Sequence, residues 1–392
     1  MASMSAAPRT QTRGTPRTDK EDSLGNIQEA IAEEVLENAA EVPPDASLDV
    51  PGQPNGPNAP SLQLVLSAAS DPEIIKLLPD GSKVLRIEPC GVSSWASTAR
   101  FETETANGQR QDYFLKILDT QDAYDRVYGE YMSMAEIHKT LASIAPKPYG
   151  YGKCHNQVKK EEGTTSNAHF FLCDFLQLDT GMPNPVRLSQ TLAKLHRISE
   201  SPTGKFGFHC TTFDGKLPLT TTWESSWTAF FTRLIKDVYR LDTEVNGVWP
   251  EFDSLMEITV EKLIPRLLDP LTANGRTIKP SLIHGDLWES NIGTDRHTGE
   301  IYIYDACAYY AHHEKEIAIW RCEHHKLDKD GYIEEYLKNL PESEPKGEFK
   351  DRGLLYSVET LLMNSAHYPG SDTRKKAFDE LQWLINKYQK DW

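Results

Sequence analysis

The sequence predicts an α+β protein with two lobes, a small β-rich lobe followed by a larger, mainly helical one. Three observations carry this prediction. The 392 residues exceed one typical domain, short β-type runs gather before residue 174, and three-to-four apolar spacing dominates from residue 190 onward. We therefore expect a leader over 1–60, an amino-terminal lobe over 61–174 and a carboxy-terminal lobe over 175–392.

Charge and composition exclude several classes of protein. Lys and Arg number 42 against 58 Asp and Glu, a net charge of −16, which disfavours a nucleic-acid partner bound through a broad basic surface. No stretch approaches the roughly 18 apolar residues of a membrane span, so we expect no membrane partner. The six cysteines include no Cys-x-x-Cys pair and are expected to be reduced thiols of a cytoplasmic protein.

Residues 1–60 are expected to be a disordered, acidic, proline-rich leader, because they hold few aromatic or branched apolar side chains. Within them, an isoleucine-rich stretch near Ile27 has helical spacing and predicts a short amphipathic helix. Three arginines before the first acidic residue are similar to those of some organelle presequences, so mitochondrial import is the alternative location. These arginines are Arg9, Arg13 and Arg17.

The amino-terminal lobe should begin as an antiparallel meander. Three runs have β-type composition, and the turn-forming pair Asn107-Gly108 separates the last two. A helix should follow, with most of its apolar side chains on one face, and then an apolar strand at 169–173. The three runs are 84–88, 97–103 and 113–118. The helical face consists of Tyr124, Val127, Tyr128, Tyr131, Met134 and Leu141.

Helices should dominate the carboxy-terminal lobe. One strand-turn-strand unit near 281–305 interrupts them. A β-rich lobe beside a helical one favours an active site between the two. The expected helices lie within 188–198, 223–241, 253–268, 331–339, 353–363 and 375–388.

A polar loop in that unit carries the residues best suited to chemistry. Asp286 and Asn291 have the spacing by which a phosphoryl-transfer loop places a carboxylate near the attacking hydroxyl and an amide oxygen on a metal ion. Asp305 ends an apolar run, where a carboxylate can hold Mg²⁺ that bridges nucleotide phosphates. The loop reads Ser281-Leu282-Ile283-His284-Gly285-Asp286-Leu287-Trp288-Glu289-Ser290-Asn291.

The amino-terminal lobe supplies candidates for nucleotide binding. Lys116 lies on an apolar strand, where its cation can reach phosphates, and Glu130 on the following helix is the natural partner for an ion pair. The strand that ends at Asp174 and Phe175 should join the lobes, and its backbone could pair with an adenine edge. An ordinary core strand fits these residues equally well.

These residues resemble the fructosamine kinases, also called ketosamine-3-kinases, which share the two-lobed protein-kinase-like fold. The likeness covers roughly 87–388, and fungal members look most similar. Trp288, after the candidate catalytic aspartate, separates this group from many aminoglycoside and choline kinases. Besides the loop above, the resemblance includes Lys205-Phe206-Gly207-Phe208, Trp223-Glu224-Ser225-Ser226-Trp227-Thr228-Ala229-Phe230-Phe231 and Tyr304-Asp305-Ala306-Cys307-Ala308-Tyr309-Tyr310.

The resemblance implies a role for each candidate. Asp286 would be the catalytic base, Asn291 and Asp305 would be Mg²⁺ ligands, and Lys116, held by Glu130, would contact the phosphates. It also implies transfer of the ATP γ-phosphate to the 3-hydroxyl of a ketoamine sugar attached to an amine.

Two departures from kinase patterns stand out. The loop expected over the phosphates has the single glycine Gly91, and the hydroxyls of Ser93 and Ser94 could partly replace backbone contacts. Neither Phe-Gly nor an Ala-Pro-Glu segment follows Asp305, which leaves little room for an activation loop. This favours a small-molecule substrate or a single exposed side chain.

Trp288 is expected near the base, where its indole could be a platform for the sugar. The alternative is a core tryptophan that fixes the loop. His284 and Tyr310 are the other candidate substrate residues. The pair His312-His313 lacks the spacing of a zinc finger.

The sequence therefore predicts an ATP- and Mg²⁺-dependent cytoplasmic kinase of ketosamines, either small molecules or glycated protein lysines, that repairs glycation. One alternative is a kinase of another hydroxylated amine, of the aminoglycoside or choline type. The other is a nucleotide-binding scaffold with weak catalysis, which the single glycine of the phosphate loop favours. The sugar, the amine and the oligomeric state stay open.

Overall fold

The computed structural model describes residues 62–91, 93, 95–156, 167–329 and 331–391. The predicted leader over 1–60, with its helix near Ile27, lies outside the described residues. So does Ser94. Residues 57–392 belong to one compact unit.

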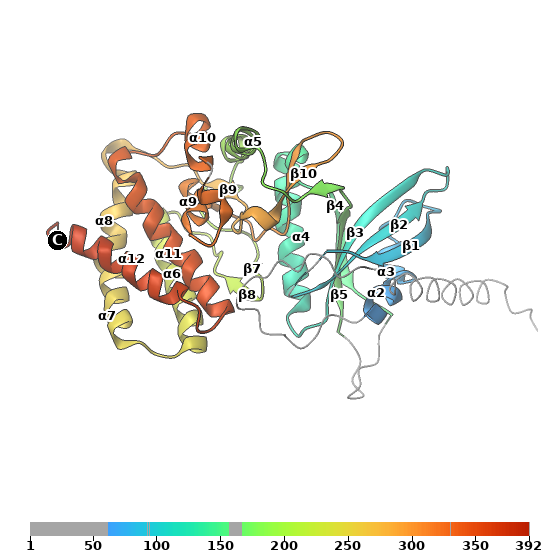
Figure 1. The fold of residues 1–392 in the computed structure, drawn as a ribbon, viewed down its shortest axis with the longest axis horizontal. Coiled ribbons are helices and arrows are strands. Elements are labelled where there is room, and N and C mark those ends of the chain that lie inside the picture. Colours follow the sequence, from blue (N-terminus) through green and yellow to red (C-terminus); the bar gives the residue numbers. More distant parts are fainter. Residues whose placement is uncertain (1–61, 92, 94, 157–166, 330, 392) are drawn as a thin grey trace, which may run out of the picture. The chain divides into compact units, whose positions relative to one another are not determined.

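The first part of this unit is a five-stranded antiparallel sheet (Figure 1). Its strands are β1 (Lys83–Pro89), β2 (Ser97–Glu104), β3 (Arg110–Leu118), β4 (Pro148–Lys153) and β5 (His169–Asp174), in the spatial order β1-β2-β3-β5-β4. Every second residue of β2 is buried, and Phe101 pairs with Tyr113 of β3, as expected where one sheet face packs on a core. The predicted meander is present, and β4 adds an edge strand.

Two short helices before the sheet were not predicted. They are α2 (Leu62–Ala68) and α3 (Pro72–Ile75). Leu64, Val65 and Ile74 are buried against the apolar face of the sheet. Asp71 caps α3 by accepting a hydrogen bond from the Glu73 amide at 3.0 Å, so an N-cap followed by a proline was the available signal.

Helix α4 (Ala123–Thr140) packs on β4 and β5. Val127 and Met134 are buried, as predicted. Tyr124 is 49% exposed, and its ring stacks on that of Tyr128 at the edge of the same face. Tyr128 and Tyr131 lie beside the ring of Tyr151 in β4, where aromatic rings pack while their hydroxyls stay near water.

Helices form most of the second part of the unit (Figure 1). The predicted helix from residue 223 begins later, because Ser226 caps it through a hydrogen bond from the Ala229 amide at 3.2 Å. The predicted helix 253–268 is broken by a π-helical segment, η2 (Thr259–Leu263), ahead of Pro265, which lacks an amide donor. The helices are α5 (Pro185–Ile198), α6 (Trp227–Asn246), α7 (Pro250–Ile258), α8 (Ile264–Leu268), α9 (Glu314–Ala318), α10 (Tyr332–Asn339), α11 (Phe349–His367) and α12 (Thr373–Tyr388).

Short strands and 3₁₀ turns lie among these helices. The strands form three small antiparallel groups: β11-β10-β6, β12-β9 and β7-β8. They are β6 (Leu178–Asp179), β7 (Thr212–Asp214), β8 (Leu217–Leu219), β9 (Ser281–Ile283), β10 (Ile292–Asp295), β11 (Ile301–Ile303) and β12 (Tyr309–Ala311). The turns are η1 (Ala142–Ile144), η3 (Asp269–Leu271), η4 (Ala273–Gly275), η5 (Glu289–Asn291), η6 (Ile319–Arg321), η7 (Lys326–Asp328) and η8 (Lys346–Glu348).

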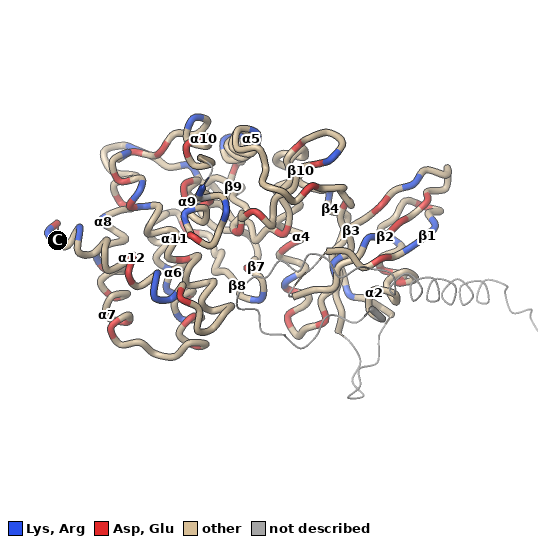
Figure 2. The backbone as a smooth tube through the Cα atoms, in the orientation of Figure 1, with Lys and Arg blue, Asp and Glu red and all other residues tan. Residues whose placement is uncertain are grey.

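Two hydrophobic cores hold the unit together. One joins α2, α3 and the sheet, and the larger one joins α4 with the helical part. Figure 2 shows acidic and basic residues interspersed along the described backbone, without a continuous basic stripe. Among the described helices, none has the length and apolar character needed to cross a bilayer.

Candidate active site

The loop that follows β9 carries the predicted catalytic residue. Gly285 turns it sharply with φ +91°, and a Cβ atom there would lie 2.5 Å from the Cys307 carbonyl oxygen, so only glycine fits. The buried carboxylate of Glu316 accepts hydrogen bonds from the amides of His284 and Gly285, the latter at 3.1 Å. Glu316 thereby holds the loop that carries Asp286.

Asp286 and Asn291 come together across that loop. The Asn291 side-chain amide donates to the Asp286 backbone carbonyl at 2.7 Å and to its carboxylate Oδ2 at 3.0 Å. Burial raises the pKa of Asp286 well above its ordinary value, and the fields of Asp214 and Asp305 add to this effect. The Asn291 amide fixes the orientation of the candidate base.

Asp305 lies just after β11 and reaches the sheet. Its Oδ1 atom is 2.6 Å from Nζ of Lys116, which projects from β3. Glu130 of α4 lies 2.8 Å from the same ammonium. The predicted pair of Lys116 and Glu130 is therefore present, and Asp305 is its third member.

The three charges adjust one another. Burial disfavours the Lys116 ammonium, but Asp305 and Glu130 outweigh it and raise the pKa of Lys116. Burial raises the pKa of Glu130 to about 7, although Lys116 opposes this. The surrounding protein keeps water from one side of the Asp305 carboxylate, which works against its charge, but Lys116 overcomes this effect and lowers the pKa of Asp305. At neutral pH, Lys116 and Asp305 are therefore both charged.

The backbone around Asp305 is held in an unusual conformation. Asp305 has φ +61°, the left-handed region that few non-glycine residues adopt. On either side, the Tyr304 amide donates to the Asn291 carbonyl at 3.1 Å, and the Cys307 amide donates to the His284 carbonyl at 3.0 Å. These bonds tie the candidate metal ligand to the catalytic loop.

The donor atoms near Asp305 fit a magnesium ion. Asn291 uses its amide nitrogen on Asp286, which leaves its carbonyl oxygen Oδ1 available. Asp305 uses Oδ1 on Lys116, and its side chain is 55% exposed. Amide and carboxylate oxygens are the ligands that Mg²⁺ prefers.

His284 and Tyr310, both predicted as substrate residues, are buried in the scaffold. His284 is fully buried; its Nε2 donates to the Tyr304 carbonyl at 2.9 Å, and its Nδ1 accepts from the Asp286 amide at 3.3 Å. Tyr310 is 1% exposed, and its hydroxyl donates to Glu136 at 3.0 Å. Both side chains thus position neighbouring residues.

Trp288 is the predicted substrate residue that the structure leaves partly exposed. Its amide donates to the Asp286 carbonyl at 3.3 Å, and its ring centroid lies 5.6 Å from that of His325. The indole therefore lies beside the candidate base with part of its surface free.

The phosphate loop is closed by its own side chains. Gly91 has φ +71°, and Ser93 Oγ accepts hydrogen bonds from the Trp95 and Ala96 amides, each at 3.2 Å. The Ser93 hydroxyl proton can still be donated to a phosphate oxygen. Burial raises the pKa of Cys90 to about 11, so its sulfur is a thiol at neutral pH.

The end of β5 also has internal partners. The Asp174 carboxylate accepts from the Lys147 amide at 3.1 Å and from the Tyr149 hydroxyl at 2.8 Å. The Phe175 amide donates to the Asp112 carbonyl at 3.2 Å. The Asp174 carboxylate thus fixes the strand end.

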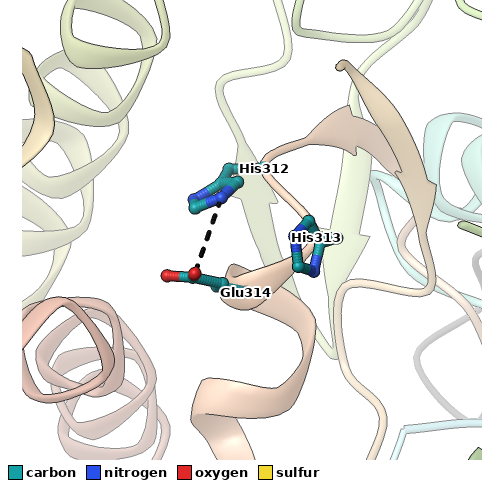
Figure 3. A group of neighbouring side chains, drawn as sticks. All are labelled: His312, His313 and Glu314. Atoms are coloured by element: carbon teal, nitrogen blue, oxygen red, sulfur yellow. Dashed lines mark ion pairs between the residues drawn. The ribbon is translucent and has the colours of Figure 1, made fainter. Parts of the chain in front are cut away.

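His312, His313 and Glu314 form a cluster whose geometry could suggest a metal (Figure 3). Their polar atoms have other partners. Arg352 forms two hydrogen bonds with the Glu314 carboxylate, at 2.8 and 2.9 Å. His312 contacts the hydroxyls of Tyr356 at 3.0 Å and Ser343 at 2.8 Å. His313 contacts the Tyr336 hydroxyl at 3.1 Å. Arg352 supplies the positive charge here, so the cluster is a buried structural network.

Comparison with known proteins identifies the family. The sequence profile described as fructosamine kinase matches residues 94–387. The chain belongs to the fructosamine kinase family. This confirms the family resemblance, and it makes the chain a kinase with a hydroxyl group as acceptor. Membership also agrees with the placement of Asp286, Asn291 and Asp305 in one site.

Curated relatives of this family member share about a quarter of its residues. The chain is 27% identical over 251 residues to the protein-ribulosamine 3-kinase, chloroplastic, of Oryza sativa subsp. japonica, covering 64% of this chain and 66% of the relative. It is 25% identical over 228 residues to the ketosamine-3-kinase of Mus musculus, covering 53% of this chain and 68% of the relative. The match thus spans about two thirds of each relative.

Solved structures confirm the kinase-like fold of this family member. A protein described as a fructosamine-3-kinase from Thermobifida fusca superposes with a TM-score of 0.62 at 19% identity, covering 81% of this chain and 99% of that one. Its counterpart from Haemophilus somnus gives a TM-score of 0.58 at 19% identity, covering 77% and 92%.

Sequence reasoning missed two carboxylates of this family member's site. Glu316, which holds the catalytic loop, lies in the short helix α9, and the burial of a charged residue is not visible in sequence. Asp214, which acts on the pKa of Asp286, precedes a glycine in an ordinary turn pattern. The order of charges along the chain carried no signal for either.

Proposed function

We propose that this family member transfers the γ-phosphate of ATP to the 3-hydroxyl of a ketosamine, free or carried on a glycated protein lysine. The observation that supports this most is the convergence of Lys116, Glu130 and Asp305 with Asp286 and Asn291 in a chain of this family. The names of the plant and mouse relatives agree with this substrate class.

In the proposed reaction, Asp286 orients the sugar hydroxyl and accepts its proton as the phosphoryl group is transferred. Lys116 contacts the phosphates and is directed by Glu130. Asn291 and Asp305 would hold Mg²⁺, which supplies positive charge against the phosphate oxygens when bound.

The remaining nucleotide contacts are assigned to the amino-terminal lobe. Gly91 and the hydroxyl of Ser93 would lie over the phosphates, and the backbone beside Asp174 and Phe175 would receive the adenine. Trp288 would support the sugar ring, since its indole is partly exposed beside the base. A cytoplasmic location, and the lack of membrane and nucleic-acid partners, stay predictions.

A substrate panel tests this function. Purified full-length protein with ATP and Mg²⁺ is incubated with fructosamines, ribulosamines, an aminoglycoside and choline, and the products are identified by mass spectrometry and phosphorus NMR. We expect phosphate on the 3-hydroxyl of the ketosamines. Transfer to choline or the aminoglycoside alone would favour the second kinase class, and nucleotide binding without any transfer would favour the scaffold.

A further inference from the structure

The β7-β8 hairpin places an unassigned carboxylate beside the candidate base. Thr212 Oγ1 of β7 donates to the Cys307 carbonyl at 3.2 Å, which directs that face of the strand toward the loop after Asp305. Asp214 is two residues further along and lies on the same face, because side chains alternate along a strand. On the other side, the backbone of Thr211 touches Gly129 of α4.

One oxygen of the Asp214 carboxylate is fixed and the other is open. The His367 Nε2 atom lies 3.2 Å from Asp214 Oδ1 and 3.1 Å from its backbone carbonyl oxygen. The His367 side chain is only 7% exposed, whereas that of Asp214 is 26% exposed. Among the described residues, none donates a hydrogen bond to Oδ2 of Asp214. His367 therefore fixes the position of the carboxylate, and its Oδ2 atom can accept a further hydrogen bond.

An aromatic wall from the phosphate loop closes the other side. The Trp95 ring centroid lies 5.4 Å from that of His367. The Lys216 ammonium lies 5.3 Å from the Trp95 centroid. An ammonium therefore already rests on this indole, which is the arrangement by which aromatic faces attract cations.

Negative charge is in excess around Asp214. The Cys307 carbonyl that Thr212 contacts also lies against Gly285, the residue before Asp286, so the carboxylates of Asp214 and Asp286 are neighbours. In the described part of the chain, His367 is the only basic side chain within ion-pair distance of Asp214. A ligand that brings positive charge would relieve the repulsion between these neighbouring carboxylates.

We propose that Asp214 binds the protonated amine of the ketosamine through its open oxygen, with His367 holding the carboxylate in place. This inference rests on the proposed function and names the feature of the substrate that the site selects. Aliphatic amines are protonated at neutral pH. In a ketosamine, four bonds of about 1.5 Å separate the amine nitrogen from the 3-hydroxyl oxygen, so a carboxylate for the amine must stand next to the base for that hydroxyl.

The test uses two substrates that differ at the amine position alone, where an oxygen removes both the positive charge and the N–H donors. One is a ketosamine such as fructosyl-lysine, and the other is the matching ketose ether, in which oxygen replaces the amine nitrogen. For the wild type we expect kcat/KM to be at least about tenfold higher for the amine, since a hydrogen bond between charged groups is worth roughly 10- to 100-fold. Asp214→Asn should remove most of this preference by raising KM for the amine, whereas any effect of the lost charge on Asp286 should change kcat for the amine and the ether alike.

Controls distinguish amine binding by Asp214 from a structural role of this residue and from failure of the proposed function. Asp80→Asn removes one exposed carboxylate that is distant from Asp214 in the sequence, and it should leave both kcat/KM values unchanged. Equal losses on amine and ether in Asp214→Asn would make Asp214 structural and overturn the inference. The wild-type comparison needs no variant, and equal kcat/KM values there would overturn it as well. A wild type that phosphorylates neither ketose would overturn the proposed function instead, and the inference with it.

Discussion

Asp286 combines a raised pKa with a hydrogen bond that restrains its carboxylate. Replacement of Asp286 by Asn keeps the shape of the side chain and its contact with Asn291, but an amide is a poor proton acceptor. We expect phosphorylation to fall by roughly 10²- to 10⁴-fold, with melting temperature and nucleotide affinity nearly unchanged. Steady-state kinetics with a ketosamine check this, and turnover within threefold of wild type would remove Asp286 from the role of base.

Asp305 differs from Asp286 because its carboxylate is bound to Lys116 and half exposed. In Asp305→Asn, the loss of charge should weaken binding of ATP with Mg²⁺ more than binding of ATP alone. Titration calorimetry with and without Mg²⁺ measures both affinities, and Asp80→Asn is the matched control. Equal weakening in the two titrations would show that Asp305 acts only through Lys116.

Trp288 can be tested for its two roles in one variant. A partly exposed indole that stacks on a sugar contributes about 0.5–1.5 kcal/mol, so Trp288→Ala should raise KM for ketosamines about threefold to tenfold. ATP affinity and melting temperature should stay close to wild type. A loss of about 3–5 kcal/mol in the free energy of unfolding, with KM retained at low temperature, would instead mark a core residue.

At the scale of elements, helix α4 connects the sheet with the rest of the site. Glu130 projects from it toward Lys116, and the preceding residue Gly129 lets the helix approach β7 closely. A Cβ atom on Gly129 would lie 2.7 Å from the Thr211 backbone oxygen. The position of Glu130 thus depends on contact between α4 and a strand more than 80 residues later.

Gly129→Ala tests this contact. Alanine ordinarily stabilises a helix interior by about 1 kcal/mol relative to glycine, but here the added methyl group meets backbone. We expect a net destabilisation of about 1–3 kcal/mol and reduced kcat, measured by thermal unfolding and kinetics. Gly347→Ala, where nothing lies within 4 Å of the new Cβ, should be neutral, and equal behaviour of the two variants would contradict this account.

The sequence was sufficient for those parts of the site that depend on local spacing. The candidate catalytic and metal-binding residues lie at strand ends and in a short loop, so their spacing along the chain already predicts that they lie close together. These are Asp286, Asn291 and Asp305. Glu316 and Asp214 reach the same loop from helix α9 and strand β7, and that convergence arises from tertiary packing. The buried partners of His284 were hidden for the same reason, because burial is a property of the folded chain.

Element boundaries show the same division. The meander β1 to β3 and most helices follow from alternating or three-to-four apolar spacing, which one segment contains by itself. Helices α2 and α3 are too short to show a period, and they are stable only because Leu64 and Ile74 are buried on the sheet.

At the scale of the whole molecule, buried histidines couple folding to pH. Burial lowers the pKa of His312 and of His313 well below the ordinary 6.5. Below pH 6.5 the unfolded chain binds protons that the folded chain does not, so stability falls as pH decreases, by up to about 1.4 kcal/mol per pH unit for each group. Above pH 6.5 their contribution is constant.

Thermal unfolding between pH 7.5 and about pH 5 checks this dependence. We expect the melting temperature to fall below pH 6.5 in the wild type and to fall less steeply in His312→Gln, where one titrating group is gone. His297→Gln, at an exposed position, should retain the full dependence. A wild type equally stable at pH 5 and pH 7.5 would contradict this interpretation of the network.

The attachment of α4 has a consequence for control of the enzyme. Many protein kinases are switched off by swinging the corresponding helix away, which breaks the lysine-glutamate pair. Here Ser133 Oγ of α4 accepts a hydrogen bond from the Ala308 amide at 3.0 Å, and Glu136 accepts one from Tyr310. These bonds join α4 to the segment that follows Asp305. An outward movement of the helix would therefore displace the backbone next to Asp305. We expect a constitutively active enzyme whose output is set by its cellular abundance and by the supply of glycated amines.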